Sequence, residues 1–155
     1  HHIHGLDATI LRLFTVYGPA GRPDMSIFKF VRGVTEGNPI TLFGNGGKRD
    51  FTYVDDAARA IIAALRPVGY QIVNVGSEKP IEIKKVISII EGTVGGKSVI
   101  RIQQRDASDI DATWANIERA RTLLEWHPNA NLEKAIAETV EWYVKNREWA
   151  TTLIM

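Results

Sequence analysis

Hydrophobic positions along the chain follow two periodicities, one typical of buried strands and the other of amphipathic helices. Short runs rich in β-branched and aromatic residues predict strands, and these runs are residues 8–16, 40–43, 71–75 and 98–103. Apolar residues at helical spacing predict helices, and these stretches are residues 25–36, 56–65, 81–91, 116–125 and 131–148. Because strands and helices alternate along the chain, we expect an α/β fold built in layers.

Glycine, proline and capping residues mark the expected ends of several elements. Gly37 and Gly92 are expected to stop two helices, since glycine readily adopts the left-handed conformation of a helix end. Asp55 is a good N-cap for helix 56–65, which Pro67 closes. No internal repeat, low-complexity stretch or linker interrupts the 155 residues, so we expect one domain with a sizeable core.

Composition narrows the classes of function. Hydrophobic residues make up 45% of the chain and charged residues 24%, the balance of an ordinary globular protein. The 19 basic and 18 acidic residues nearly cancel, which gives no overall attraction to nucleic acid or to an anionic membrane. The absence of cysteine excludes a disulfide framework, a thiolate metal site and a cysteine nucleophile, and fits a reducing compartment. With no apolar run long enough for a membrane helix and no signal-peptide pattern, we expect a cytoplasmic protein.

Two other patterns suggest chemistry that the surrounding residues do not support. The histidines in residues 1–4 could be a tag remnant or a metal site, but Ile3 interrupts the tag pattern and few carboxylates lie nearby, so we expect no metal. Residues 92–98 nearly spell a phosphate-binding loop, but the glycine spacing is one residue short and a helix precedes it where a strand should. We expect a helix end followed by a turn there.

The first segment that could carry chemistry is residues 12–24, where the expected strand runs into a glycine- and proline-rich loop. The end of such a strand presents its last polar side chains at the carboxyl edge of the sheet, where open α/β folds bind ligands. Thr15 and Tyr17 are therefore candidates for a binding site. Packing at the end of a strand explains them equally well from the residues alone.

A second segment, residues 44–56, combines a glycine loop with charged residues. Glycine exposes backbone N–H groups, and Arg49 carries a rigid fork of donors suited to a phosphate. A turn with a solvated basic pair is the alternative. Asp55 and Asp56 resemble a pair of catalytic carboxylates, but adjacent positions at a helix start point apart, so N-capping is favoured.

The third segment, residues 105–113, could hold a phosphate with Arg105 and a sugar hydroxyl with a carboxylate; a polar loop with solvated charges is the alternative. We interpret the tryptophans as core or helix-packing groups, because a net charge near zero does not favour binding of single-stranded nucleic acid. The four tryptophans are Trp114, Trp126, Trp142 and Trp149.

Taken together, the three segments resemble the extended short-chain dehydrogenase/reductase superfamily, and they look most like its uronate-type UDP-sugar 4-epimerases. The resemblance runs over nearly the whole chain. Its most specific stretch is GLDATILRLFTVYGPAGRPDMSIFKF, and the others are GNGGKRDFTYVDDAARAI, NVGSEKPIEI and SDIDATWANIERARTLLEWHPNANLEKAI.

The resemblance implies an architecture in two parts, an amino-terminal Rossmann domain that binds NAD and a smaller α/β carboxy-terminal part that clasps the UDP-sugar. Residues 1–155 would be the carboxy-terminal substrate-binding domain, carrying the last parallel strands of the Rossmann sheet at residues 8–16 and 71–75. The residues that would contact the UDP-sugar are Arg49 and Arg105 at the phosphates, Arg22 at the same nucleotide, Thr15 at the sugar or its carboxylate, Phe43 at the uracil and Asp109 at the ribose. Tyr17 and Pro19 would flank the nicotinamide.

In this family a tyrosine of a Tyr-x-x-x-Lys pair takes a proton from the 4-hydroxyl while NAD accepts hydride, and the 4-keto sugar is then reduced on its other face. None of the four tyrosines here is followed by lysine at the fourth position, and no glycine-rich dinucleotide motif is present. We therefore expect this chain to hold no catalytic residue and to be the substrate half of an isomerase whose NAD-binding half lies outside it.

Two alternatives remain open at this stage. One is a fragment of a sugar-nucleotide dehydratase or decarboxylase of the same superfamily, and the other is a binding or assembly module without activity. Residues 8–16 are apolar throughout and normally pair inside a parallel sheet, so we also expect self-association into a homo-oligomer.

Overall fold

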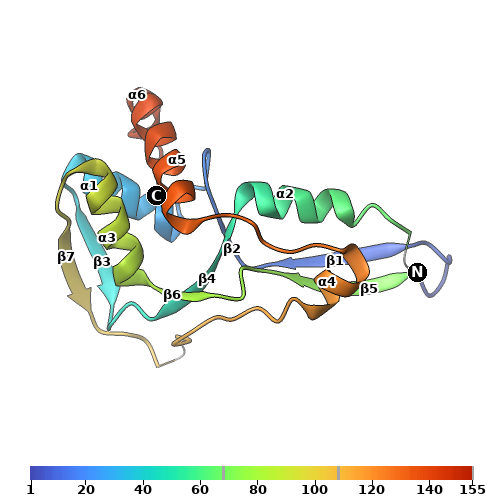
Figure 1. Cartoon of the computed structure of the whole chain (residues 1–155). Helices are drawn as coiled ribbons and strands as arrows, with labels where there is room; N and C mark the ends of the chain where they lie inside the picture. Colours follow the sequence, from blue (N-terminus) through green and yellow to red (C-terminus); the bar gives the residue numbers. More distant parts are fainter. Residues whose placement is uncertain (68, 108, 155) are drawn as a thin grey trace.

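Strands and helices alternate along the chain in the computed structural model, which describes residues 1–67, 69–107 and 109–154 and confirms the α/β class (Figure 1). The strands are β1 (Ala8–Leu13), β2 (Thr15–Tyr17), β3 (Pro39–Phe43), β4 (Lys48–Tyr53), β5 (Tyr70–Val75), β6 (Pro80–Glu82) and β7 (Val99–Gln103). The helices are α1 (Ser26–Glu36), α2 (Val54–Ala63), α3 (Ile83–Val94), α4 (Glu118–Leu124), α5 (Leu132–Lys145) and α6 (Arg147–Ala150). None of them is long and apolar enough, within the described residues, to cross a membrane.

The strands form three small sheets. Parallel pairs join β1 to β5 and β3 to β7, while the central sheet has the order β2-β4-β6 with β4 and β6 antiparallel. The single strand expected over residues 8–16 is divided at Phe14, whose N–H still donates to the carbonyl of Val75 at 2.9 Å. The strand divides because its partner β5 ends at Val75, and residues 15–17 pair with β4 instead.

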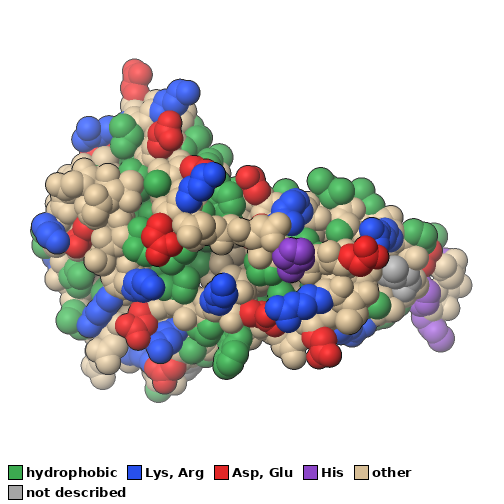
Figure 2. All heavy atoms as spheres, in the orientation of Figure 1, with side chains coloured by type: hydrophobic (Ala, Val, Ile, Leu, Met, Phe, Trp, Pro, Cys, Tyr) green, Lys and Arg blue, Asp and Glu red, His purple; other side chains and the backbone are tan. Residues whose placement is uncertain are grey.

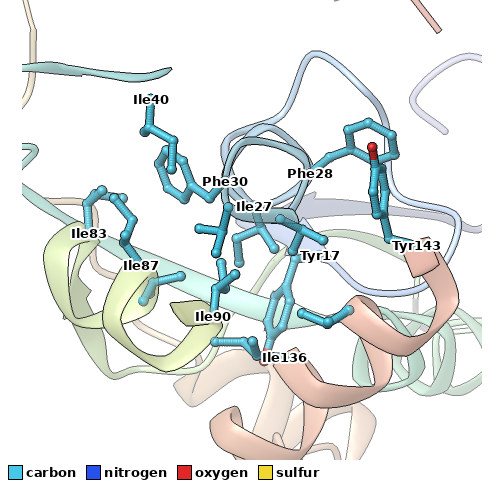
Figure 3. Packing of buried hydrophobic residues seen from close by; sticks show 14 of the residues in the cluster. Tyr17, Ile27, Phe28, Phe30, Ile40, Ile83, Ile87, Ile90, Ile136 and Tyr143 are labelled. Atoms are coloured by element: carbon cyan, nitrogen blue, oxygen red, sulfur yellow. The ribbon is translucent and has the colours of Figure 1, made fainter. Parts of the chain in front are cut away.

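Two regions extend from the central sheet in opposite directions in Figure 1. We call the first the lobe; it contains α1, α3, α5, α6, β3 and β7. Its core lies where α1, α3 and α5 meet, and Figure 3 shows Tyr17, Ile90 and Ile136 pointing toward one another there. Phe28 and Tyr143 pack edge to face with ring centroids 5.6 Å apart. Apolar side chains therefore enter this core from all three helices.

We call the second region the arm; it contains β1, β5, α2 and α4. A small core fills the space between the helices and one face of the β1–β5 pair, and its members are Ala60, Val73, Val75, Ala115, Ile117, Ala120, Leu124 and Trp126. The opposite face is open: Ile10 and Ile72, which pair in register, are 45% and 37% exposed. Among the described residues, β1 hydrogen-bonds with no strand other than β5. The arm is thus half covered.

Several element boundaries differ from the sequence expectation. Helix α2 begins at Val54 with Tyr53 at the cap position, so Asp55 lies in the first turn and the predicted N-cap is wrong. Helix α3 continues through Gly92 to Val94 and ends at Gly95, whose φ is 75°.

The end of the chain differs too. The helix expected over 131–148 is divided at Asn146 into α5 and α6. Trp126 is buried and the rings of Trp142 and Trp149 pack edge to face, as expected for packing groups. Trp114 is 70% exposed, so the packing prediction is wrong for that residue.

Candidate functional site

The largest group of predicted site residues lies around a cavity of about 590 Å³ between α1, β3 and the segment 103–110, which we call the β3 cavity. Phe43, Arg49, Arg105 and Asp109 all line it, although they come from three separate parts of the sequence. Phe43 stands at the end of β3 and is 51% exposed. The fold therefore brings together the residues expected at the uracil, the phosphates and the ribose.

The remaining predicted residues line a second, more open cavity of about 710 Å³ at the end of β2, which we call the β2 cavity. Thr15, Pro19 and Arg22 lie along its wall. Tyr17 also contributes to the wall, but its side chain is almost fully buried and its ring packs edge to face on Phe51. Any contact from Tyr17 to a ligand must therefore come from the few of its atoms that reach the cavity.

Arg22 and Asp24 form an ion pair where the two cavities adjoin, since Arg22 lines the β2 cavity and Asp24 the β3 cavity. The guanidinium donates to both carboxylate oxygens, at 3.0 and 2.5 Å. These hydrogen bonds hold the pKa of Asp24 below its usual range. Both side chains are at least half exposed, so the pair is accessible to a ligand from either cavity.

Arg49 lies on β4 beside the glycine loop, where its Nη1 donates to the carbonyl of Lys48 at 2.8 Å and to that of Asp111 at 3.4 Å. The Lys48 N–H donates to the same Asp111 carbonyl at 2.8 Å. Gly47 permits this close approach: its φ is 68°, and a Cβ at that position would lie 2.5 Å from the Asp111 oxygen. The glycine loop thus positions Arg49 against the segment that contains Asp111.

Arg105 is held by its own segment. Its Nη1 donates to the carboxylate of Asp111, and its Nη2 donates to the carbonyl of Asp109 at 2.6 Å. The Asp109 N–H in turn donates to the carbonyl of Asp106 at 3.1 Å. Ser108, in the same segment, lies outside the described residues. The described residues Asp109 and Asp111 therefore both accept hydrogen bonds from one guanidinium.

The charge around the β3 cavity favours an anion. Four basic side chains line it against two acidic ones, and these are Lys29, Arg32, Arg49 and Arg105 against Asp24 and Asp109. Over the face shown in Figure 2 the two signs are interspersed, with no broad basic patch. Sequence reasoning missed Lys29 and Arg32, although their three-residue spacing on α1 placed them beside each other.

Asp50, next to Arg49, is a buried carboxylate that sequence reasoning did not single out. It is fully buried and accepts hydrogen bonds from the Ser77 N–H and hydroxyl at 2.6 and 2.7 Å, from the Glu78 N–H at 3.1 Å and from the Ala115 N–H at 3.0 Å. Gly76 leaves room for Asp50 and Ala115, because a Cβ there would lie 3.0 Å from an Asp50 carboxylate oxygen and 2.3 Å from the Ala115 side chain. Asp50 thus fastens β4 to the arm.

Asp56 has a similar structural role at the start of α2. It is buried and accepts from Arg59 and from the N–H groups of Asn129 and Ala130. Its carbonyl accepts from the indole N–H of Trp126 at 2.9 Å. Asp56 therefore anchors the turn before α5.

Three tyrosine hydroxyls lie in surroundings that raise their pKa. Burial raises the pKa of Tyr17 and of Tyr53 well above the usual tyrosine range, and it raises the pKa of Tyr143 to about 12. The hydroxyl of Tyr53 donates to Glu138 at 2.5 Å, and that of Tyr143 donates to Glu36 at 3.2 Å. These hydroxyls remain protonated near neutral pH and are unsuited to proton abstraction.

In the described part of the chain, no group of three or more histidine, aspartate or glutamate side chains is placed so that it could hold a metal ion. What the described side chains offer is a binding surface for a polar anion, with a buried scaffold beneath it.

Comparison with known proteins gives a consistent result. Residues 1–76 match the model of the NAD dependent epimerase/dehydratase family. A UDP-glucuronate 4-epimerase from Thermodesulfobacterium geofontis is 47% identical over 150 residues, which cover 96% of this chain and 46% of that protein. The chain spans about half the length of the curated relatives it matches.

Solved structures show the same relationship. UDP-glucuronic acid 4-epimerase from Bacillus cereus, in complex with UDP-glucuronic acid and NAD, superimposes with a TM-score of 0.88 at 32% identity, covering 94% of this chain and 48% of that one. UDP-glucose 4-epimerase from Thermotoga maritima gives 0.88 at 25% identity over the same shares. The resemblance inferred from the sequence motifs is confirmed, as is the Rossmann-type α/β class.

Proposed function

We propose that residues 1–155 are the carboxy-terminal substrate-binding domain of an NAD-dependent UDP-sugar epimerase. The proposal is supported by the similarity of the chain to such enzymes in sequence and in structure. The complete enzyme inverts carbon 4 of a UDP-hexose or UDP-hexuronate through a 4-keto sugar. Its amino-terminal NAD-binding part and its catalytic base lie outside this chain.

The observation that carries the proposal is the convergence of Phe43, Arg49, Arg105 and Asp109 on one cavity with an excess of basic side chains. A nucleoside diphosphate offers a flat base, a ribose and a pair of charged phosphates. Arginine suits phosphates because its fork of N–H groups matches their oxygens. We assign the phosphates to Arg49 and Arg105, the ribose to Asp109 and the uracil to backbone groups around Phe43.

The β2 cavity adjoins the proposed nucleotide site at the Arg22–Asp24 pair, and we assign it to the sugar and to one end of the cofactor. Arg22 reaches the nucleotide from this side, and Thr15 meets the sugar or its carboxylate. The cavity wall at Pro19 and Tyr17 fits a flat nicotinamide ring at the end of a strand. When bound, NAD supplies the hydride acceptor and donor; this chain orients the sugar beside it.

Titration of the folded chain with UDP, followed by calorimetry, tests the proposal. Arg49→Gln is expected to weaken binding by about tenfold or more, because a phosphate loses a charged donor. Arg66→Gln is the matched control, since Arg66 pairs with Glu125 in the arm, away from both cavities. A folded chain that binds no UDP at millimolar concentration would show that these residues do not hold the nucleotide.

We also propose that the chain self-associates through the open face of the arm, where Ile10 and Ile72 are exposed. A parallel strand with an uncovered face and a free edge favours pairing with another chain. A reducing cytoplasmic compartment is proposed as well, on the ground that the chain contains no cysteine.

A further inference from the structure

Asp111 accepts hydrogen bonds from both of the arginines that we assign to the phosphates, through its side chain from one and through its backbone from the other. Its carboxylate accepts from Arg105, and its backbone carbonyl accepts from Arg49 at 3.4 Å. The carboxylate therefore takes a guanidinium donor of Arg105 that a bound phosphate would use. An anion of the chain itself therefore occupies part of the arginine pair.

The backbone of Asp111 is held by hydrogen bonds to β4, whereas its side chain is largely exposed. The carbonyl accepts from the Lys48 N–H at 2.8 Å, and the adjoining residues continue beside β4, since the Thr113 N–H donates to the Lys48 carbonyl at 3.2 Å. The Asp111 side chain, by contrast, is 90% exposed, while that of Arg105 is 28% exposed. Rotation of this side chain can release Arg105 without disturbing the strand-like pairing.

We propose that the Asp111 carboxylate is an internal competitor for the phosphate site, displaced when a diphosphate binds. The inference rests on the proposed nucleotide site and adds a residue that controls affinity and selectivity there. An incoming anion must replace an ion pair that already exists. A diphosphate carries enough charge to do so, whereas a single carboxylate gains little by exchanging with another carboxylate. Asp111 thus selects for diphosphate ligands.

Arg22 and Asp24 form a second ion pair at the β3 cavity, with Asp24 on the cavity wall. Its two members are two residues apart in the sequence, so the pair is local. Asp111 differs because it also contacts Arg49, 62 residues away, so that it couples two separate segments. It is therefore the better position to test.

The experiment compares the whole chain with its Asp111→Asn variant by calorimetry, using UDP, inorganic pyrophosphate and uridine as separate probes. The asparagine side chain keeps the shape of the aspartate and removes its charge. We expect the dissociation constants for UDP and pyrophosphate to fall about three- to tenfold, because exposed ion pairs are weak competitors. Binding of uridine, which has no phosphate, is expected to stay unchanged.

Two further variants make the result specific. Glu78→Gln removes the carboxylate partner of Arg121, an ion pair outside both cavities, and is expected to leave UDP affinity unchanged. In an Arg105→Gln background, Asp111→Asn is expected to give a smaller gain or none, because the two substitutions act on one interaction. Circular dichroism confirms that each variant is folded.

Equal or weaker binding of UDP by the Asp111→Asn variant, while the unchanged chain binds, would overturn the competitor role alone. An equal gain for uridine would also overturn it, because the effect would then not involve the phosphates. If neither chain binds UDP or pyrophosphate at millimolar concentration, both the proposed nucleotide site and the competitor role fail.

Discussion

The lobe and the arm bury their apolar residues to different degrees. In the lobe, α1, α3 and α5 surround a common core, and Val86, Ile90 and Ile136 are completely buried. In the arm, helices cover one face of the β1–β5 pair, while Ile10 and Ile72 face outward on the other. Both regions leave some apolar side chains exposed, and on β7 of the lobe Val99, Ile100 and Ile102 are 53%, 42% and 69% exposed. The regions differ in the size of the buried core, which is larger in the lobe.

The difference in burial points to separate roles for the two regions: the lobe forms the proposed nucleotide site, and the arm offers a surface for docking. The β3 cavity lies between α1, β3 and the segment 103–110, and α1 and β3 both pack into the larger core of the lobe. The strand pair of the arm leads into the β2 cavity, where the sugar and cofactor are assigned. We therefore expect the nucleotide site to be formed within the isolated chain, and the open face to be the place where further protein docks.

Matched isoleucine truncations give the largest expected contrast between the two regions. Ile136→Ala removes a completely buried side chain from the lobe and should lower the free energy of unfolding by about 2–5 kcal/mol. Ile10→Ala removes a side chain that is 45% exposed and should cost about 0.5 kcal/mol. Urea denaturation followed by circular dichroism measures both. Equal losses would mean that the arm is covered in solution.

Asp50 tests the connection between the regions. Asp50→Asn replaces an acceptor of four hydrogen bonds with a group that also donates, which should cost about 2–3 kcal/mol of unfolding free energy. The matched control is Asp55→Asn, at an exposed position in the first turn of α2, with an expected cost below about 1 kcal/mol. Similar costs at both positions would contradict the anchoring role of Asp50.

A smaller effect is expected from Glu36 in the lobe, through its pH dependence. The hydrogen bond from Arg147, with one from Tyr143, lowers the pKa of Glu36 below its unfolded value of about 4.3. The resulting stability is present above about pH 4.3 and is lost as the pH falls through the folded pKa. Because Arg147 is largely exposed, the contribution should be about 1 kcal/mol or less.

Thermal unfolding between about pH 3 and 7 measures this contribution. The Glu36→Gln variant should show a flatter decline of the midpoint temperature between about pH 5 and 3 than the unchanged chain. A parallel decline in the two proteins would show that Glu36 does not contribute in this range.

The smallest change in stability, with a clear change in assembly, is expected for Ile10→Lys in the arm. A charge on the open face should cost about 0.5 kcal/mol of unfolding free energy or less, yet it should oppose association, because lysine resists edge and face pairing. Sedimentation at high protein concentration should show oligomers for the unchanged chain and fewer for the variant. A monodisperse monomer before substitution would contradict self-association.

The sequence predicted most of the elements because their apolar spacing is local information. Helix α1, for example, has the expected stripe and ends at Gly37 with a φ of 69°. Features that depend on distant partners were not predicted. The strand over residues 8–16 divides where its partner β5 ends. Strand β4 was not expected from local spacing, and it is stabilised by pairing with β2 and β6. Asp55 suited an N-cap by type, but packing placed the helix start earlier.

For the candidate site, residue types and spacing within the sequence determined which side chains are present and, through resemblance, what each is expected to contact. Only the tertiary structure decided that Arg49 and Arg105 share a cavity and both contact Asp111, since β4 meets Asp111 and Ala112 through long-range pairing. It also decided that Tyr17 lies in the core and that one face of the arm is open. Local sequence determines the chemistry of each side chain, whereas the burial of that side chain and the residues that it contacts depend on residues far along the chain.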